Sequence, residues 1–201
     1  YFLGETGIPE DNTLLVVECA GRIDLEGIMK AVQSTHFMLH RLTFQELVLA
    51  KLNAMEAETG RIASVIYIID LDELKLHPSL ISIVTGPYRI LWATCYMNYP
   101  EWLNTVLIVN CPPFTSLLWR AISPLLPERT RNKVRICSSS SEAKVVARSF
   151  VSASHLPVQW GGDMVNSEIA DRLSAKRDPI HSSKYWTPDY LAPAVSNLTR
   201  V

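Results

Sequence analysis

Two histidines in this sequence have the spacing of a possible metal site. His36 and His40 are four residues apart, so they would share one face of a helix. No acidic residue stands between them as in the HExxH motif of zinc proteases. We therefore expect two surface or packed histidines and no metal site.

Other residue types that carry chemistry lack the neighbours that chemistry needs. Ser138–Ser141 lacks the flanking glycines of a GxSxG nucleophile elbow, and no strand is followed by GxGxxG or GxxxxGK[ST]. Asp70 and Asp72 follow a predicted strand at its carboxyl end, where α/β active sites lie. They equally suit a loop that caps the next segment, which is the reading we favour. Cys111, followed by two prolines, is expected to be a buried thiol.

Glu101 and Lys133 form a more specific pair. Each stands just before a segment that reads as a buried strand, 104–111 for Glu101 and 134–137 for Lys133. If the two strands are neighbours, both side chains lie at one rim of the sheet. There they could contact each other or a polar group of a ligand, although each taken alone is explained by an ordinary surface charge.

The elements that would position these residues alternate along the chain. Apolar and β-branched runs predict strands at 14–19, 62–70, 104–111 and 134–137. Periodic segments predict helices at 25–32, 34–59, 78–95, 114–122 and 141–151, whereas residues 1–13 read as irregular. Gly60 is placed to end the second helix, and Gly86-Pro87 should kink or split the third. The alternation predicts an α/β domain with a mostly parallel sheet covered by helices.

The helix at 114–122 is apolar over most of its circumference and ends before Pro124. One interpretation is a core helix packed on both sides. The other is a gating helix between the hinges Pro112-Pro113 and Pro124, with an inner face toward an apolar cavity and an outer face toward a membrane. Its apolar residues, with the leucines that follow, are Phe114, Leu117, Leu118, Trp119, Ile122, Leu125 and Leu126.

Composition narrows the class of protein. A length of 201 residues fits one domain with a tail, and the net charge of −1 gives no global attraction to nucleic acid. Four cysteines without a CxxC pair predict reduced thiols, as in a cytoplasmic protein. No apolar run reaches the length of about 18 residues that a membrane-spanning helix requires.

Several short motifs in order resemble the CRAL-TRIO, or Sec14-like, lipid-binding domain. The resemblance covers roughly residues 10 to 163 and is specific through the order and spacing of its parts. These are Gly21–Gly27, Ile68–Leu71, Asn98-Tyr99-Pro100-Glu101, Val109–Pro112, Trp119 with Pro124–Leu126, Thr130–Val134 and Leu156–Gly162.

The resemblance implies a sheet floor under a pocket for one phospholipid or other hydrophobic molecule, with no enzymatic activity and no further cofactor. The pocket residues would be Val65, Tyr67, Ile69, Val106 and Ile108, and residues 114–126 would form the gate. Family members that bind phosphatidylinositol use a Glu, a Lys and a Thr at the headgroup, which match Glu101, Lys133 and Thr130. A transfer protein of the cytoplasm that contacts membranes transiently is the function this implies.

The resemblance also divides the chain. Residues 1–163 would be the lipid-binding domain without its usual preceding helical region, and 164–201 a polar linker. Ser183–Trp186 resembles the connector to a GOLD domain in animal Sec14-like proteins, through which protein partners could bind. A scaffold with a vestigial pocket stays open as the alternative function.

Overall fold

The computed structural model describes residues 2–99, 101–137 and 139–165. Expectations for Pro100 and for the segment 166–201, with Ser183–Trp186, lie outside the described residues. Residues 1–163 form one compact unit, and the description below concerns that unit.

Five strands form one sheet in the order β1-β2-β3-β4-β5. Strands β2 to β5 are parallel, and β1 pairs with β2 in the antiparallel sense. This arrangement confirms the predicted α/β class with a mostly parallel sheet. The strands are β1 (Phe2–Glu5), β2 (Thr13–Glu18), β3 (Ser64–Asp70), β4 (Leu103–Val109) and β5 (Val134–Ile136).

The strand β1 differs from the prediction that residues 1–13 are irregular. It has only four residues, one of them Gly4, so it carries too little pattern to stand out. Its register with β2 places Leu3 opposite Val16, and the partner strand supplies the order that the local sequence does not. The Thr6 hydroxyl beyond its end donates to the Thr13 carbonyl at 3.1 Å.

Helices and single turns connect the strands. The α-helices are α1 (Leu25–Ala31), α2 (Ser34–Thr59), α3 (Pro78–Thr85), α4 (Pro87–Asn98), α5 (Thr115–Ile122), α6 (Glu128–Arg131) and α7 (Ser140–Arg148). The 3-10 turns are η1 (Pro9–Asp11), η2 (Ala20–Arg22), η3 (Ser123–Leu125), η4 (Ala153–His155) and η5 (Val158–Trp160).

The helix ends follow from identifiable residues. The Asp24 carboxylate accepts from the Gly27 amide at 2.9 Å and starts α1. Gly60 ends α2 with φ of 65°, a left-handed conformation that costs glycine little. Gly86-Pro87 splits the predicted third helix into α3 and α4, because proline has no amide hydrogen to continue the ladder.

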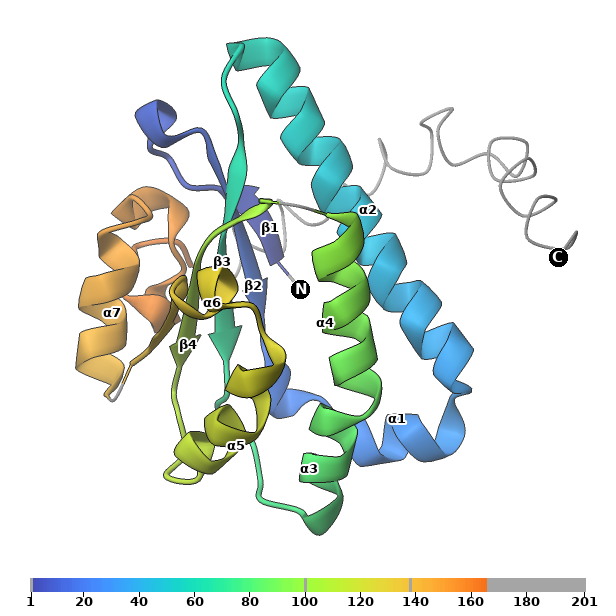
Figure 1. Cartoon of the computed structure of the whole chain (residues 1–201). Coiled ribbons are helices and arrows are strands. Elements are labelled where there is room, and N and C mark those ends of the chain that lie inside the picture. Colours follow the sequence, from blue (N-terminus) through green and yellow to red (C-terminus); the bar gives the residue numbers. More distant parts are fainter. Residues whose placement is uncertain (1, 100, 138, 166–201) are drawn as a thin grey trace, which may run out of the picture. The chain divides into compact units, whose positions relative to one another are not determined.

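The two faces of the sheet are covered differently (Figure 1). Helix α7 and the segment after it lie on one face. The long helices α2 and α4 lie on the other, and α3 and α5 complete that second face near the carboxyl ends of the strands. Within the described residues no helix is long and apolar enough to cross a membrane.

Candidate functional site

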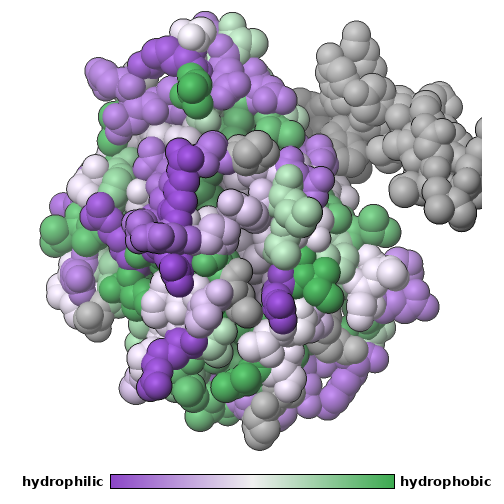
Figure 2. All heavy atoms as spheres, viewed as in Figure 1, coloured by the Kyte–Doolittle hydropathy of each residue, from purple (hydrophilic) through white to green (hydrophobic). Residues whose placement is uncertain are grey.

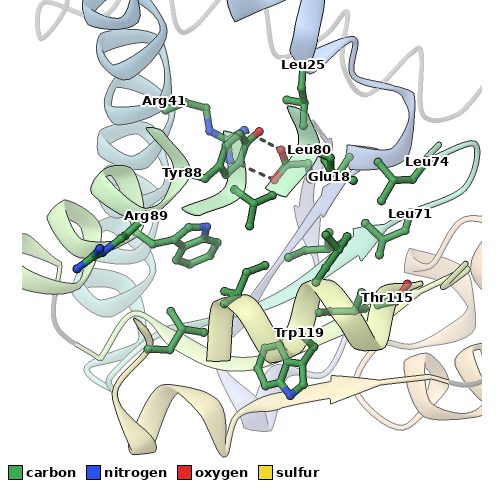
Figure 3. Close-up of a pocket in the computed structure, with 18 residues that line it drawn as sticks. Glu18, Leu25, Arg41, Leu71, Leu74, Leu80, Tyr88, Arg89, Thr115 and Trp119 are labelled. Carbon is green, nitrogen blue, oxygen red and sulfur yellow. Dashed lines mark hydrogen bonds and ion pairs between the residues drawn. The ribbon is translucent and has the colours of Figure 1, made fainter. Parts of the chain in front are cut away.

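An apolar cavity of about 170 Å³ lies on the α2–α5 side of the sheet, at the carboxyl ends of the strands (Figure 3). Ile69 of β3 and Ile108 of β4 form its floor, and these two residues are adjacent in the sheet register. Carbon atoms make up most of the wall, which includes Leu25, Leu71, Leu74, Leu80, Val84, Trp92, Leu118, Trp119, Ile122 and Leu126. The cavity therefore selects for an apolar molecule.

A buried ion pair closes the inner end of this apolar cavity. Arg41 of α2 donates to both carboxylate oxygens of Glu18 at 2.7 and 3.2 Å, and the Tyr67 hydroxyl donates to Glu18 at 2.5 Å. The Arg41 guanidinium also lies 5.8 Å from the ring centroid of Tyr88. Figure 3 shows Glu18, Arg41 and Tyr88 converging from β2, α2 and α4.

Burial governs the protonation of this cluster. Glu18, Arg41 and Tyr67 are each less than a tenth exposed. Burial raises the pKa of the Glu18 carboxyl to about 7, and its hydrogen bond with Tyr67 opposes the rise. Burial likewise raises the pKa of Tyr67, which keeps its hydroxyl protonated and donating.

A second hollow has a volume of about 240 Å³ and lies at the amino ends of β4 and β5. We call it the polar pocket because Glu101, Arg129 and Lys133 line it beside apolar residues. It is lined by all three residues that were predicted to form a headgroup site, namely Glu101, Thr130 and Lys133. Lys133 Nζ lies 3.3 Å from Glu101 Oε2 and donates to the Leu103 carbonyl at 2.6 Å. Arg129 Nη2 lies 3.1 Å from the same Glu101 oxygen, so two cations flank one carboxylate.

Hydrophilic side chains gather over α6, which carries Arg129 and Thr130 (Figure 2). Lys133 follows α6 directly, with its amide donating to the Thr130 carbonyl at 3.1 Å. A four-residue helix between Pro127 and β5 thus fixes three polar residues at one rim. This is the rim that the positions before the two strands predict for Glu101 and Lys133.

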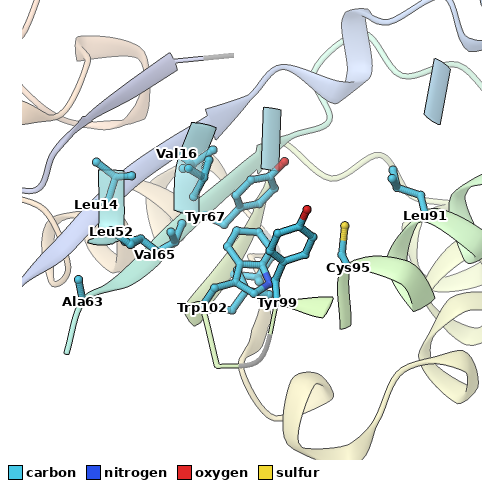
Figure 4. Close-up of a cluster of buried hydrophobic side chains, with 13 residues drawn as sticks. Leu14, Val16, Leu52, Ala63, Val65, Tyr67, Leu91, Cys95, Tyr99 and Trp102 are labelled. Carbon is cyan, nitrogen blue, oxygen red and sulfur yellow. The ribbon is translucent and has the colours of Figure 1, made fainter. Parts of the chain in front are cut away.

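The five predicted pocket residues lie in three different places. Ile69 and Ile108 line the apolar cavity. Tyr67 borders a small cavity beside α2. Val65 and Val106 belong to the buried cluster around Trp102 and line none of the cavities described here (Figure 4).

The predicted gating residues also differ in where they lie. Leu118, Trp119, Ile122 and Leu126 line the apolar cavity, whereas the Leu117 side chain is 47% exposed on the outer side of α5. Phe114 is half-buried at the start of α5 and is not part of the cavity wall. The structure does not describe the side chain of Leu125.

The residues weighed for catalysis or metal binding have other surroundings. His36 and His40 are exposed on α2, and the described residues contain no group of three or more potential metal ligands. The buried Asp70 carboxylate accepts from Trp160 Nε1 and Asn110 Nδ2, both at 2.9 Å, so it holds separate segments together. Burial raises the pKa of Cys111 to about 11, away from the thiolate form that reacts.

Sequence reasoning missed Glu18, Arg41 and Gln45, although a signal was present. The buried stripe of α2 is Phe37, Arg41, Gln45, Val48 and Leu52, with spacings of four, four, three and four residues. Two polar residues interrupt this apolar stripe, and such an interruption points to buried polar partners.

Comparison with known proteins places the chain among CRAL/TRIO domains. The sequence model of the CRAL/TRIO domain matches residues 9–162. A CRAL-TRIO domain-containing protein of Caenorhabditis elegans is 31% identical over 192 residues, which are 96% of this chain and 45% of that protein. Patellin-5 of Arabidopsis thaliana is 28% identical over 89 residues, 39% of this chain and 13% of its own length.

Solved structures show the same fold. The crystal structure of Sfh5 superposes with a TM-score of 0.65 at 15% sequence identity, covering 88% of this chain and 62% of that one. The chain spans a little under half the length of the nematode relative.

Proposed function

Because this chain belongs to the CRAL/TRIO domain family, we propose that it encloses one phospholipid or other hydrophobic molecule and transfers or presents it between membranes. The observation that carries the proposal is the pairing of an apolar cavity with a polar pocket. The two share Trp92 and Leu126 in their walls. A molecule with apolar chains and a polar head fits such a pair of hollows.

The driving force for enclosure is the removal of acyl chains from water. Each Å² of apolar surface buried contributes about 25 cal/mol, so several hundred Å² of lipid chain stabilise the complex strongly. The walls built from Ile69, Ile108 and Leu118 supply that apolar surface. Binding alone accounts for these features, and we infer no chemical step on the cargo.

The polar pocket favours a phosphatidylinositol-type headgroup. The Lys133 ammonium can contact a phosphate oxygen, and the Thr130 hydroxyl can donate to it. The Glu101 carboxylate can accept from ring hydroxyls of the headgroup. Arg129 and Lys133 both flank Glu101. One pocket therefore offers two cations for a phosphate and one carboxylate that can accept hydrogen bonds.

Loading requires movement of α5. The apolar cavity is smaller than the roughly 300–1,000 Å³ of most ligand sites, so a whole phospholipid needs more room. Helix α5 lies between Pro113 and Pro124, and its inner residues form one wall of the apolar cavity. An outward swing at a membrane surface would open it, with Leu117 placed to contact lipid. We propose that the protein is cytoplasmic and contacts membranes transiently.

The headgroup assignment is tested by loading the protein from vesicles that contain either phosphatidylinositol or diacylglycerol, which has no charged head. We expect Lys133→Ala to weaken loading of phosphatidylinositol by about tenfold, since it removes a charge-assisted contact, and to leave diacylglycerol unchanged. Lys144→Ala, an exposed lysine of α7, is the matched control. Equal losses for both lipids would remove Lys133 from the headgroup site.

Native mass spectrometry of the same protein separates this proposal from the scaffold alternative. A lipid-transfer domain carries one lipid per chain after loading. A scaffold with a vestigial pocket would stay empty with either vesicle type.

A further inference from the structure

One donor in the interior of the described structure has no acceptor. Gln45 lies on the inner stripe of α2 and is 5% exposed. Its Nε2 atom has no hydrogen-bond partner among the described residues. Leaving a buried amide donor unpaired costs free energy, so such a group in a native protein calls for an explanation, and a bound ligand that supplies an acceptor is one.

A small cavity lies next to this donor. It has a volume of about 20 Å³, enough for a single water-sized atom group, and Gln45 is part of its wall. Arg41 and Tyr67 also line it, and both direct donors to Glu18. Those donors are engaged with Glu18, whereas the Gln45 amide at the same cavity has no acceptor in the described part of the chain, so this donor suits an oxygen atom of a ligand.

The position of the small cavity is informative, because it borders both larger hollows. It shares Arg41 and Trp92 with the apolar cavity. It shares Trp92, Cys95 and Trp102 with the polar pocket. Figure 4 shows Tyr67, Trp102, Tyr99 and Cys95 gathered at this junction, with the Tyr67 and Trp102 rings edge to face at 6.1 Å between centroids.

The chemical groups of a glycerolipid follow the same order as the polar pocket, the small cavity and the apolar cavity. Its headgroup is polar, its chains are apolar, and ester groups join the two. With the headgroup in the polar pocket and the chains in the apolar cavity, an ester comes to lie near the small cavity.

We propose that Gln45 Nε2 donates a hydrogen bond to an ester carbonyl oxygen of the bound lipid, and that this contact makes the domain selective for acyl-ester over alkyl-ether lipids. An ether-linked lipid has a methylene where the ester has its carbonyl, so it would leave the Gln45 donor unpaired. The inference rests on the proposed lipid-binding function and adds a specificity determinant to it.

The test is competitive loading from vesicles that contain equal amounts of diester and diether phosphatidylinositol with identical headgroups and chain lengths, read by mass spectrometry of extracted lipid. The wild-type chain is expected to favour the diester by about tenfold, as one buried hydrogen bond provides. Gln45→Met, which keeps the length of the side chain but removes the donor, is expected to abolish that preference. Gln159→Met, at an exposed position of η5, should retain it.

The outcomes distinguish a failure of the ester contact from a failure of the proposed lipid-binding function. Equal loading of both lipids by the wild-type chain would overturn the ester contact and assign the small cavity to a water molecule, while lipid binding would stand. This result does not depend on whether Gln45→Met folds. Loading of neither lipid would overturn the lipid-binding function and the ester contact together.

Discussion

Two halves of one sheet face differ in how they are filled. Val65 at the amino end of β3 and Val106 in the middle of β4 belong to a buried cluster with Leu52 of α2 and with Trp102, and we call this part the filled half. At the carboxyl ends of the same strands, in what we call the hollow half, Ile69 and Ile108 are only partly buried against that cluster and border the apolar cavity. Since all four side chains project from the same face, strand alternation does not distinguish a packed position from a cavity wall.

The difference comes from the helices above each half. The 26-residue helix α2 lies over the filled half and brings Val48 and Leu52 against the strands. Above the hollow half, α3 and α5 have only eight residues each, and prolines or glycines stand at their ends. Two short helices cover the strands less completely than one long helix, whose buried stripe packs against them over its length.

The largest expected effect concerns the buried pair at the inner end of the apolar cavity. Arg41→Met leaves the Glu18 carboxylate buried without its cation, and we expect the free energy of unfolding to fall by about 3–5 kcal/mol. Urea unfolding measures the change. Lys30→Met, in the exposed pair with Glu26, is the control and should change it little. If both variants lowered the free energy of unfolding by the same small amount, the buried Glu18–Arg41 pair would not stabilise the wall of the cavity.

Truncating one residue in each half measures the difference in packing directly. Leu52→Ala, in the filled half, should lower the free energy of unfolding by about 3 kcal/mol, because it opens a hole in a close-packed cluster. Ile108→Ala should cost about 2 kcal/mol, because this partly buried side chain already borders a cavity and loses fewer contacts. Both values come from urea unfolding of lipid-free protein. Similar costs at both sites would show that the two halves are equally packed.

Enlarging one residue in each half gives the converse test. Val65→Phe should destabilise the fold by about 2 kcal/mol through overpacking. Ile69→Phe should leave stability nearly unchanged but reduce lipid loading from vesicles, because the ring occupies the apolar cavity. Unimpaired loading of Ile69→Phe would place the lipid elsewhere.

The smallest effect on the fold is expected at Leu117 of α5, which is exposed, whereas its neighbour Leu118 is buried. Leu118→Asp would bury an unpaired charge in the cavity wall, so it should both lower the free energy of unfolding and reduce lipid loading. Leu117→Asp should leave loading and stability unchanged but slow transfer between vesicles, since the exposed side chain contacts the membrane. Transfer at the wild-type rate in both variants would contradict the gating role of α5.

The sequence predicted the parts of the molecule that local patterns determine. Apolar strand runs and the Gly60 and Gly86-Pro87 boundaries were sufficient for the sheet class and most helix limits. The proximity of Glu101 and Lys133 followed because the amino ends of neighbouring parallel strands lie at one edge.

Features that depend on packing between distant segments were not predicted. The strand β1 needs β2 to define it. The burial of Arg41 depends on Glu18, which is 23 residues away in sequence. Val65 and Val106 are packed whereas Ile69 and Ile108 line a cavity. This difference depends on the lengths of the helices above the strands, and the strand sequences alone do not reveal it.

The measurement that tests the central claim most directly is native mass spectrometry of the purified chain, followed by extraction and identification of any bound molecule. If the apolar cavity holds a lipid, the wild-type protein should carry one lipid per chain, with a polar head and acyl chains. The Ile69→Phe variant should show a lower occupancy. A wild-type chain that remains empty after incubation with phospholipid vesicles would contradict the account.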